Sequence, residues 1–264
     1  MRKNNVLETW KAGGAVVNGW LAIPNGYSAE VMASCGWDSV TIDLQHGMVD
    51  YTAAVPMLQA ISLSDATPMA RVPWLEPGII QKLLDAGSYG IICPMINTRS
   101  ECELLVACCN YAPKGSRSFG PIRAVMYAGA DYGEHANDTV LAIAMIETQQ
   151  AIDNLDAILS TPGLDGIYVG PSDLSLSLGH APQLDTEVPE VVAAIDTILA
   201  GAKKHGVPAG LHCGSPEYAA RMFEKGFQLA TIANDSRLMA MSAMAAVAAL
   251  KGKMADSNIS GSPY

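Results

Sequence analysis

Glu147 and Asp173 are the two side chains of this sequence with the clearest potential for chemistry. Each follows a short apolar run, in A-M-I-E-T and Y-V-G-P-S-D-L-S, where a β-strand is expected to end. Because the carboxyl ends of parallel strands in a barrel converge on one shallow bowl, the two carboxylates are expected to meet there. Hard oxygen ligands suit Mg²⁺, Mn²⁺ or Co²⁺ and leave coordination positions for substrate oxygens. Either residue alone is explained as well by helix capping, and their paired placement favours the metal site.

Further polar residues come at the ends of two earlier strands. T-I-D-L-Q-H-G brings Asp43 and His46 into the same bowl, and A-R-V-P-W brings Arg71. A histidine titrates near neutrality and can act as general base or acid if a carboxylate orients it, although a solitary loop histidine is more often incidental. A guanidinium can stabilise a developing oxyanion, balance neighbouring carboxylates, or do both.

Asp85, in K-L-L-D-A-G, lies at the expected C-terminal end of a helix, just before Gly87. The helix dipole disfavours an acidic residue there. That conflict is a hint of another role, such as orienting a histidine.

The turn G-P-S-D-L-S offers a seat for an anion. Gly170 and the following proline bend the chain so that the backbone N–H groups of Ser172 and Asp173 are expected to point outward beside the metal and to bind a carboxylate. Trp20, at the end of the first strand, is expected to wall the pocket, although a Trp in a barrel strand is often plain packing.

These residues need a scaffold of parallel strands, and short β-rich runs do alternate with helical stretches along the chain. Strand–helix alternation repeated eight times implies right-handed crossovers and a TIM (β/α)8 barrel. An open doubly wound sheet would usually carry a Gly-rich phosphate turn after its first strand, and no G-x-G-x-x-G motif follows here. The barrel domain is expected over residues 1–252, with a flexible tail at 253–264. Strands are expected at 15–23, 39–43, 68–72, 89–93, 141–146, 166–170, 208–213 and 227–232, and helices at 28–35, 51–63, 77–86, 98–109, 149–159, 187–205, 215–225 and 235–250.

Two segments suggest contacts beyond a plain barrel. The insertion at about 110–137 is rich in Gly, Pro and Arg, and loops of that length are usually functional or interfacial. The last helix, 235–250, contains LMAMSAMAAVAAL and is apolar nearly all round, so it is expected to be buried on more than one side. This favours packing against a neighbouring subunit; the other interpretation is a good helix former within its own ring of helices.

Composition narrows the class of partner. Of the 264 residues, 50% are hydrophobic and the net charge is −10 without any Lys/Arg run, which favours small molecules over nucleic acid or anionic lipid. No apolar run is long enough to span a membrane, and no secretory leader is recognised, so a cytoplasmic protein with reduced thiols is expected. Cys102, Cys108 and Cys109 fit neither a zinc ribbon nor a redox pair and are interpreted as packing residues.

The motifs together are more specific than any one of them. Y-S-A-E, I-D-L-Q-H-G, A-R-V-P-W, L-L-D-A-G, I-E-T and V-G-P-S-D-L-S occur in order over roughly residues 20–180, and G-L-H-C and T-I-A-N-D-S-R-L follow. In this combination the sequence resembles the 4-hydroxy-2-oxoheptanedioate aldolase family, the metal-dependent class II pyruvate aldolases of the aldolase/citrate lyase superfamily.

The resemblance implies a role for each residue of the bowl. Glu147 and Asp173 would bind Mg²⁺, Mn²⁺ or Co²⁺, and His46 would be the base. Asp85 would raise the basicity of His46, and Arg71 would stabilise charge in the transition state. The partners implied are a 2-oxo acid and an aldehyde.

The resemblance also implies a substrate seat and an assembly. The backbone amides of Ser172 and Asp173 would hold the carboxylate of pyruvate, and the chain would form a homohexamer, a trimer of dimers, in which the last helix is exchanged between barrels. Met145 stands where several members place a pocket glutamine, and Leu44-Gln45 replaces a Gly-Glu pair found in some members. These departures bear on the aldehyde and on the choice between pyruvate and hydroxypyruvate.

The hypothesis is therefore a reversible retro-aldol cleavage of 4-hydroxy-2-oxo acids. The metal and Arg71 polarise the 2-keto oxygen, His46 removes the 4-hydroxyl proton directly or through water, and the C3–C4 bond breaks to leave pyruvate as its enolate. No lysine ends an expected core strand, which disfavours a Schiff-base mechanism. The alternatives are a CoA-ester lyase of the citrate lyase type and a non-catalytic barrel that binds 2-oxo acids.

Overall fold

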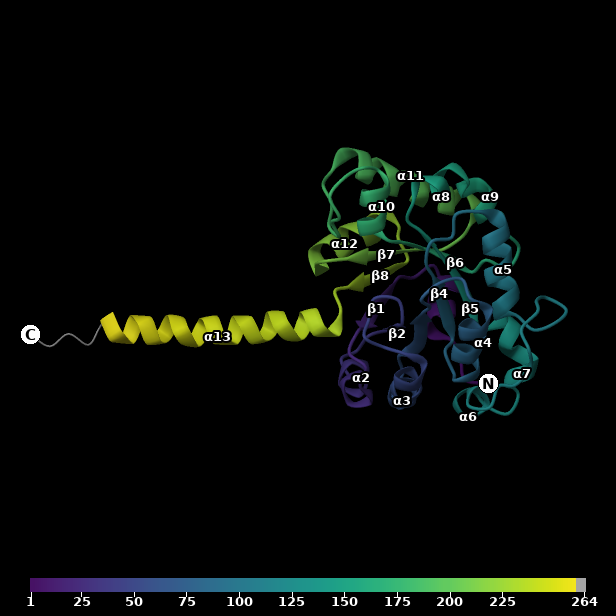
Figure 1. Ribbon diagram of the computed structural model, residues 1–264, viewed down its shortest axis with the longest axis horizontal. Helices are drawn as coiled ribbons and strands as arrows, with labels where there is room; N and C mark the ends of the chain where they lie inside the picture. The colour runs from purple at the N-terminus through teal and green to yellow at the C-terminus, as the bar shows by residue number, and fades with distance from the viewer. Residues whose placement is uncertain (260–264) are drawn as a thin grey trace, which may run out of the picture.

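Eight parallel strands close into a barrel in the computed structural model, with helices around the outside (Figure 1). Neighbours in the sequence are neighbours in the sheet, and β1 closes the ring by pairing with β8. The structure describes residues 1–259, so the last part of the expected tail, residues 260–264, lies outside the described residues. The strands are β1 Val16–Leu21, β2 Ser39–Asp43, β3 Thr67–Arg71, β4 Gly90–Cys93, β5 Leu141–Ile146, β6 Gly166–Val169, β7 Ala209–Cys213 and β8 Leu229–Ile232.

Several helices begin where a polar side chain can satisfy free backbone N–H groups. Asn25, Asp50, Thr98 and Ser215 each accept a hydrogen bond from the first turn of the helix that follows, as N-cap residues do. The helices are α1 Asn5–Lys11, α2 Gly26–Ala33, α3 Tyr51–Ile61, α4 Pro77–Asp85, α5 Arg99–Cys109, α6 Ala124–Ala128, α7 Tyr132–His135, η1 Ala136–Asp138, α8 Gln149–Asp153, α9 Leu155–Leu159, α10 Pro171–Ser177, α11 Pro189–His205, α12 Pro216–Lys225 and α13 Asp235–Ile259.

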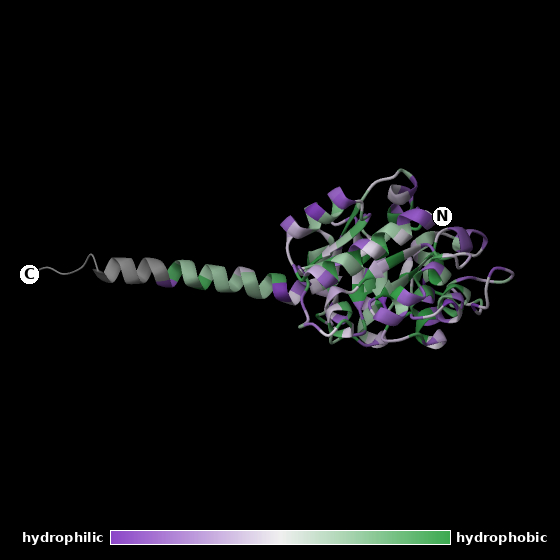
Figure 2. Cartoon of the chain, turned by 90° about the horizontal axis from the view of Figure 1, so that it is seen from above, coloured by the Kyte–Doolittle hydropathy of each residue, from purple (hydrophilic) through white to green (hydrophobic). Residues whose placement is uncertain are grey.

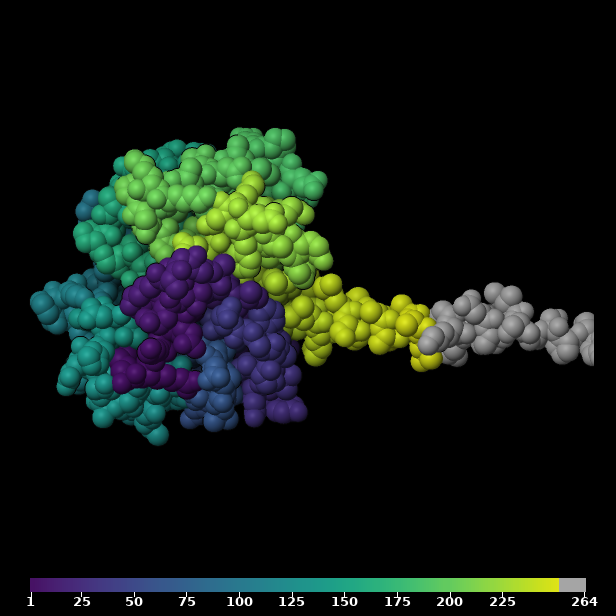
Figure 3. Space-filling model, turned by 180° about the vertical axis from the view of Figure 1, so that it is seen from behind, coloured from purple at the N-terminus to yellow at the C-terminus, as the bar shows by residue number. Residues whose placement is uncertain are grey.

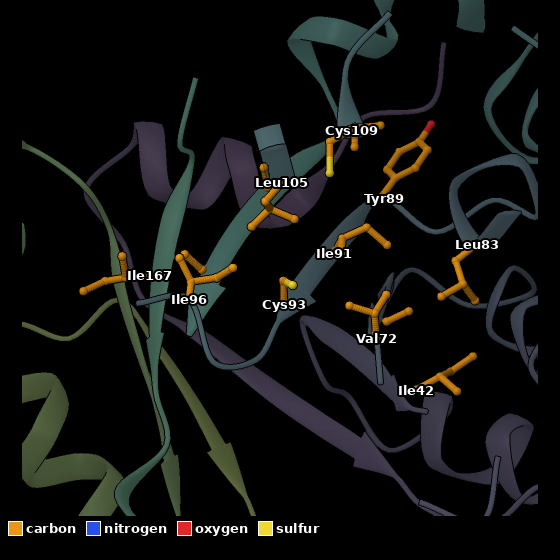
Figure 4. Packing of buried hydrophobic residues seen from close by; sticks show 14 of the residues in the cluster. Ile42, Val72, Leu83, Tyr89, Ile91, Cys93, Ile96, Leu105, Cys109 and Ile167 are labelled. Atoms are coloured by element: carbon orange, nitrogen blue, oxygen red, sulfur yellow. The ribbon is translucent and has the colours of Figure 1, made fainter. Parts of the chain in front are cut away.

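Two apolar layers give each strand an inner and an outer face. Ile143 and Met145 of β5 lie in the cluster inside the barrel, whereas Ala144 and Ile146 lie in the larger cluster between strands and helices. Figure 4 shows part of the outer layer, where β4 faces α4 and α5. Side chains alternate along a strand, so the residue after β5, Glu147, points into the barrel mouth.

Short elements that the sequence pattern did not reveal cover the amino ends of the strands. Val6 and Trp10 of α1 belong to the cluster inside the barrel, and Trp10 Nε1 donates to the carbonyl of Gln228 over 2.8 Å. The insertion at 110–137 connects the end of α5 to the start of β5 and carries α6, α7 and the start of η1. It therefore lies at the end of the barrel opposite the bowl (Figure 1).

The last helix differs most from expectation. The sequence predicts a helix over 235–250 and a flexible tail from 253, whereas α13 is continuous over Asp235–Ile259 and projects away from the barrel (Figures 1 and 3). Its apolar residues, green in Figure 2, are exposed: Met239 by 62%, Met244 by 71% and Leu250 by 62%. The interpretation that α13 packs in its own ring of helices is wrong, because its side chains at 241–251 are all exposed in the part of the chain that the structure describes. The packing against a neighbouring subunit stays a prediction.

The strand positions and the buried cysteines agree with the sequence analysis. All eight strands lie within two residues of their expected positions. The six cysteines are free, and Cys102, Cys108 and Cys109 are buried as packing residues. Among the described residues, no helix has the length and apolarity needed to cross a bilayer.

Candidate active site

A buried ion pair joins the ends of β2 and β3. Asp43 and Arg71 are opposite each other in the parallel register, and Arg71 donates from Nε to Oδ1 over 2.8 Å and from Nη2 to Oδ2 over 2.6 Å. Burial by itself raises the pKa of Asp43, but the hydrogen bonds and charge of Arg71 outweigh it and hold this pKa below its ordinary value. Two of the five N–H groups of the guanidinium are thus used, and three remain for a substrate.

Trp20 supports this pair from below. Its Nε1 donates to Asp43 Oδ2 over 3.1 Å, and the guanidinium carbon of Arg71 lies 4.9 Å from the centre of its ring. Its side chain is only 1% exposed and is not among the described residues that line the cavity. Trp20 therefore fixes the orientation of Arg71, and it is not itself a wall of the pocket as expected.

His46 follows β2 in the loop that Asp43 organises. Asp43 Oδ1 accepts the backbone N–H groups of Gln45 over 3.0 Å and of His46 over 3.3 Å. The imidazole of His46 is exposed and lines the same cavity as Arg71. Asp43 thus holds the loop by its backbone, and the imidazole remains available to a substrate.

Asp85 lies elsewhere. Helix α4 starts just after the bowl end of β3 and ends before β4, so its last residue is at the opposite end of the barrel. There Asp85 Oδ1 accepts from Arg117 Nη2 over 2.7 Å. Within the described chain Asp85 pairs with Arg117 and not with His46, because a helix in this fold runs antiparallel to the strands and carries its C-terminus away from the bowl.

Glu147 and Asp173 face the cavity from the ends of β5 and β6. Glu147 is 1% exposed, and its Oε1 accepts the backbone N–H of Met95 over 2.8 Å. Burial raises the pKa of Glu147 to about 7; the Met95 N–H opposes this rise, and the nearby charge of Asp173 adds to it. Glu147, which is buried, and Asp173, which is half-buried, therefore form an acidic pair at the cavity, while Arg71 is already paired with Asp43.

This donor set fits a divalent cation. Glu147 Oε2 has no hydrogen-bond partner among the described residues, and a Cβ on Gly170 would collide with it, so the glycine keeps this oxygen approachable. Within the described chain no cluster of three or more His, Cys, Asp and Glu side chains could hold a metal. Mg²⁺ is commonly held by only one or two carboxylates and completes its coordination with water and substrate oxygens.

The turn after β6 leaves backbone donors free. Helix α10 begins at Pro171, and its N-cap residue, Gly170, has no side chain to accept from the first turn. The N–H groups of Ser172 and Asp173 have no partner among the described residues, as expected for donors at a helix start. They lie beside Asp173 and Glu147 in the lining of one cavity.

The cavity at the barrel mouth is small. It measures about 170 Å³, which corresponds to roughly six water-sized groups at about 30 Å³ each. A larger hollow of about 610 Å³ lies at the other end, near Lys114 and Asp165, without the strand-end carboxylates. Seven expected residues line the small cavity: His46, Arg71, Met145, Glu147, Gly170, Ser172 and Asp173. Four more were not expected: Tyr168, Pro171, Leu184 and His212.

Comparison with known proteins shows which protein family this chain resembles. Residues 18–241 match the model of the HpcH/HpaI aldolase/citrate lyase family. The chain is 43% identical over 245 residues to a hydroxypyruvate/pyruvate aldolase of Rhizorhabdus wittichii, with 93% of this chain and 98% of that protein covered. It is 38% identical over 218 residues to a 5-keto-4-deoxy-D-glucarate aldolase of Escherichia coli K12, with 82% and 84% covered.

The chain belongs to the HpcH/HpaI aldolase/citrate lyase family. A family member from Burkholderia cenocepacia J2315 has the same fold, with a TM-score of 0.88 at 28% identity over 94% of this chain and 100% of that one. The resemblance noted in the sequence motifs is thus confirmed, and the protein is an aldolase, a carbon–carbon lyase.

The two unexpected aromatic residues of this aldolase site are strand residues. Tyr168 lies two residues before Gly170 on β6, and His212 lies on β7 within the motif G-L-H-C. Alternation along the strand would have found Tyr168, since residues two apart share a face. No comparable signal marks His212, because the facing of β7 depends on its register with β6.

The strained backbone of Met95 leads to a first prediction. Its φ of 56° is in the left-handed region, where a Cβ costs about 1–2 kcal/mol, and its N–H holds Glu147. We expect the free energy of unfolding, measured by urea denaturation, to be about 1 kcal/mol higher for Met95→Gly than for Met95→Ala. Both variants lose the side chain beyond Cβ and differ only in Cβ itself, so equal stabilities would contradict the assignment of strain to this turn.

Acid is expected to destabilise the protein partly through His212. Burial, and then the charge of Arg71, lowers the pKa of His212 from 6.5 to about 4. His212 binds a proton more readily in the unfolded chain than in the folded one. The contribution of neutral His212 to the free energy of unfolding is therefore complete above about pH 6.5 and is lost as the pH falls towards 4. Between pH 7 and pH 5 the wild-type protein is expected to lose about 1–2 kcal/mol more of its free energy of unfolding than His212→Gln loses. Urea denaturation of both proteins at the two pH values measures this difference. Equal losses of unfolding free energy in the two proteins would contradict this role of His212.

Proposed function

We propose that this aldolase reversibly cleaves 4-hydroxy-2-oxo acids to pyruvate or hydroxypyruvate and an aldehyde, with Mg²⁺, Mn²⁺ or Co²⁺ held by Glu147 and Asp173. The observation that supports this most is the meeting of those two carboxylates with His46 and the Asp43-bound Arg71 around one small cavity. The names of the two relatives, which act on hydroxypyruvate, pyruvate and a keto-deoxy sugar acid, support the same substrate class.

The residues of the chain then bind and orient the 2-oxo acid. A divalent cation in this place would bind the carboxylate and keto oxygens of the substrate and withdraw electrons from the keto group. The free N–H groups of Ser172 and Asp173 donate to the substrate carboxylate. Arg71, fixed by Asp43 and Trp20, directs its remaining N–H groups at the keto oxygen, where negative charge develops as the bond breaks.

His46 moves the proton. In the cleavage direction its imidazole accepts the 4-hydroxyl proton, the C4–O bond becomes the aldehyde carbonyl, and the electron pair of the C3–C4 bond passes to the 2-oxo fragment. The protonated His46 returns this proton to C3, directly or through water, and the 2-oxo acid is released. Among the described residues that line the cavity there is no lysine, so the chain offers no amine for a Schiff base there.

The two alternatives, a CoA-ester lyase and a non-catalytic barrel that binds 2-oxo acids, are less well supported. A CoA ester carries a long nucleotide with negatively charged phosphate groups, and no basic groove that could hold it is recognised in the sequence. A barrel that only binds 2-oxo acids does not need an exposed imidazole beside the carboxylates of Glu147 and Asp173.

The test is metal-dependent turnover. The protein is stripped with a chelator, and pyruvate release from several 4-hydroxy-2-oxo acids is measured before and after Mg²⁺, Mn²⁺ or Co²⁺ is restored. We expect release only with metal, and the substrate screen names the aldehyde. Undiminished release after chelation would contradict the metal role, and no turnover with any donor would favour a binding protein.

We further propose that the protein is a cytoplasmic homohexamer, a trimer of dimers, in which α13 packs on a neighbouring barrel. The exposed apolar residues of α13 support this, because such a surface is rarely left in water. In such an assembly, Asp85 at the far end of one barrel would reach an imidazole only in another copy. Light scattering of the full chain gives the mass, and a monomer would contradict the proposal.

A further inference from the structure

His212 faces the cavity on the far side of Gly170 from Glu147. The residues that precede these three, on β5, β6 and β7, are paired in one continuous row, so Glu147, Gly170 and His212 form the next row. Neighbouring strands are about 4.8 Å apart, which places the backbones of Glu147 and His212 about 10 Å apart. Because Gly170 has no side chain, the carboxylate of Glu147 can lie over it, and Glu147, Gly170 and His212 line one cavity.

A chain of hydrogen bonds fixes the proton of the imidazole. Tyr168 Oη donates to Thr231 Oγ1 over 2.7 Å, and that oxygen also accepts from Asn18 Nδ2 over 2.9 Å. With its only proton given to Thr231, Tyr168 Oη accepts from His212 Nδ1, 3.0 Å away. The neutral ring is therefore protonated on Nδ1 and carries a lone pair on Nε2.

The other nitrogen points to the substrate space. His212 lines the cavity, and its Nε2 has no hydrogen-bond partner among the described residues. This nitrogen is not fully buried, and it is therefore open to the cavity. The ring is held in place from behind by Trp20, whose ring centre is 5.1 Å away in an edge contact. The cavity thus presents a fixed hydrogen-bond acceptor opposite the acidic pair.

We propose that His212 Nε2 accepts a hydrogen bond from the hydroxyl on carbon 3 of the 2-oxo acid, so that the enzyme selects hydroxypyruvate over pyruvate. The proposal rests on the proposed function. The carboxylate and keto oxygens of a 2-oxo acid are themselves acceptors and gain nothing from a lone pair. On a three-carbon 2-oxo acid, a 3-hydroxyl is the one group that can donate to it.

The position of His212 indicates that it contacts the 2-oxo acid and not the aldehyde. His212 is a strand residue in the row of Glu147, where the 2-oxo acid is held, and the aldehyde must enter from the open side. Its pKa of about 4 makes the imidazole a weak base at neutral pH. It therefore binds a hydroxyl without taking its proton, and the proton transfer stays with His46.

A pair of donors of equal size isolates this contact. 3-Fluoropyruvate replaces the hydroxyl of hydroxypyruvate by a fluorine, which cannot donate. With one aldehyde held constant, we expect the wild-type enzyme to give a kcat/KM at least about tenfold higher for hydroxypyruvate. In His212→Phe this ratio is expected to fall about tenfold, whatever happens to the absolute rates. His135→Phe, on α7 at the other end of the barrel, is the control and is expected to keep the ratio.

A second variant guards against misfolding of the first. Tyr168→Phe removes the oxygen that holds the Nδ1 proton, so the ratio is expected to fall there as well. Nitrogen NMR of the labelled imidazole is expected to show the proton on Nδ1 in the wild-type protein. An unchanged ratio in folded His212→Phe, or a proton on Nε2, overturns the inference while aldolase activity stands. No turnover with either donor instead overturns the proposed function.

Discussion

Glu147→Gln is expected to lower kcat/KM by about 10³-fold and to weaken Mn²⁺ binding in the absence of substrate. Glu147 is the buried member of the carboxylate pair, with Oε1 held by Met95 and Oε2 kept open by Gly170. An amide of the same size removes the negative charge that attracts the cation, and such electrostatic effects are worth several kcal/mol. Isothermal titration with Mn²⁺ and steady-state pyruvate release measure the two effects separately.

Asp153→Asn is the matched control for this substitution. Asp153 is an exposed carboxylate at the end of α8, hydrogen-bonded to Gln149, and it does not line the cavity. Its variant is expected to bind Mn²⁺ and to release pyruvate as the wild-type protein does. Undiminished Mn²⁺ binding in Glu147→Gln would place the cation elsewhere.

His46→Ala is expected to lower kcat by about 10²–10⁴-fold, the usual range for loss of a general base. His46 is held by its backbone on Asp43, so its imidazole can be removed without breaking the Asp43–Arg71 pair. We therefore expect KM and Mn²⁺ affinity to change little, because the base acts on the reacting proton only.

His135→Ala serves as control for the loss of an imidazole, since His135 lies on α7 at the other end of the barrel. Its kinetics are expected to match the wild type. A His46→Ala enzyme with normal kcat would assign the proton transfer to another group, and His212 would be the first to examine.

The barrel and the pair of carboxylates could be predicted because both depend on local pattern. Each strand is a short apolar run between polar breaks, and the position of Glu147 and Asp173 just after such runs places them at the bowl. Arg71 and His46 followed for the same reason. Helices α1 and α10 have only seven residues each and too little periodicity to be recognised.

Which end or layer of the barrel a residue occupies could not be predicted from local pattern. Asp85 fits the role of an acid beside a histidine by type, but its helix carries it to the far end of its own barrel and onto Arg117, so this role stays a prediction that requires another copy of the chain. Trp20 fits a pocket wall by size, yet it lies one layer below, under Arg71. No pattern in the sequence marks His212, because its side of β7 follows from the register with β6, which only the closed barrel shows.

The central claim is that a cation lies between Glu147 and Asp173 with the 2-oxo acid beside it. Crystals of the full chain soaked with Mn²⁺ and pyruvate, and measured for the anomalous scattering of manganese, test it most directly. The account predicts one strong peak within ligand distance of both carboxylates, with the oxygens of pyruvate next to it and Arg71 facing the keto group. A peak at another position, in an enzyme that needs Mn²⁺ for activity, would contradict it.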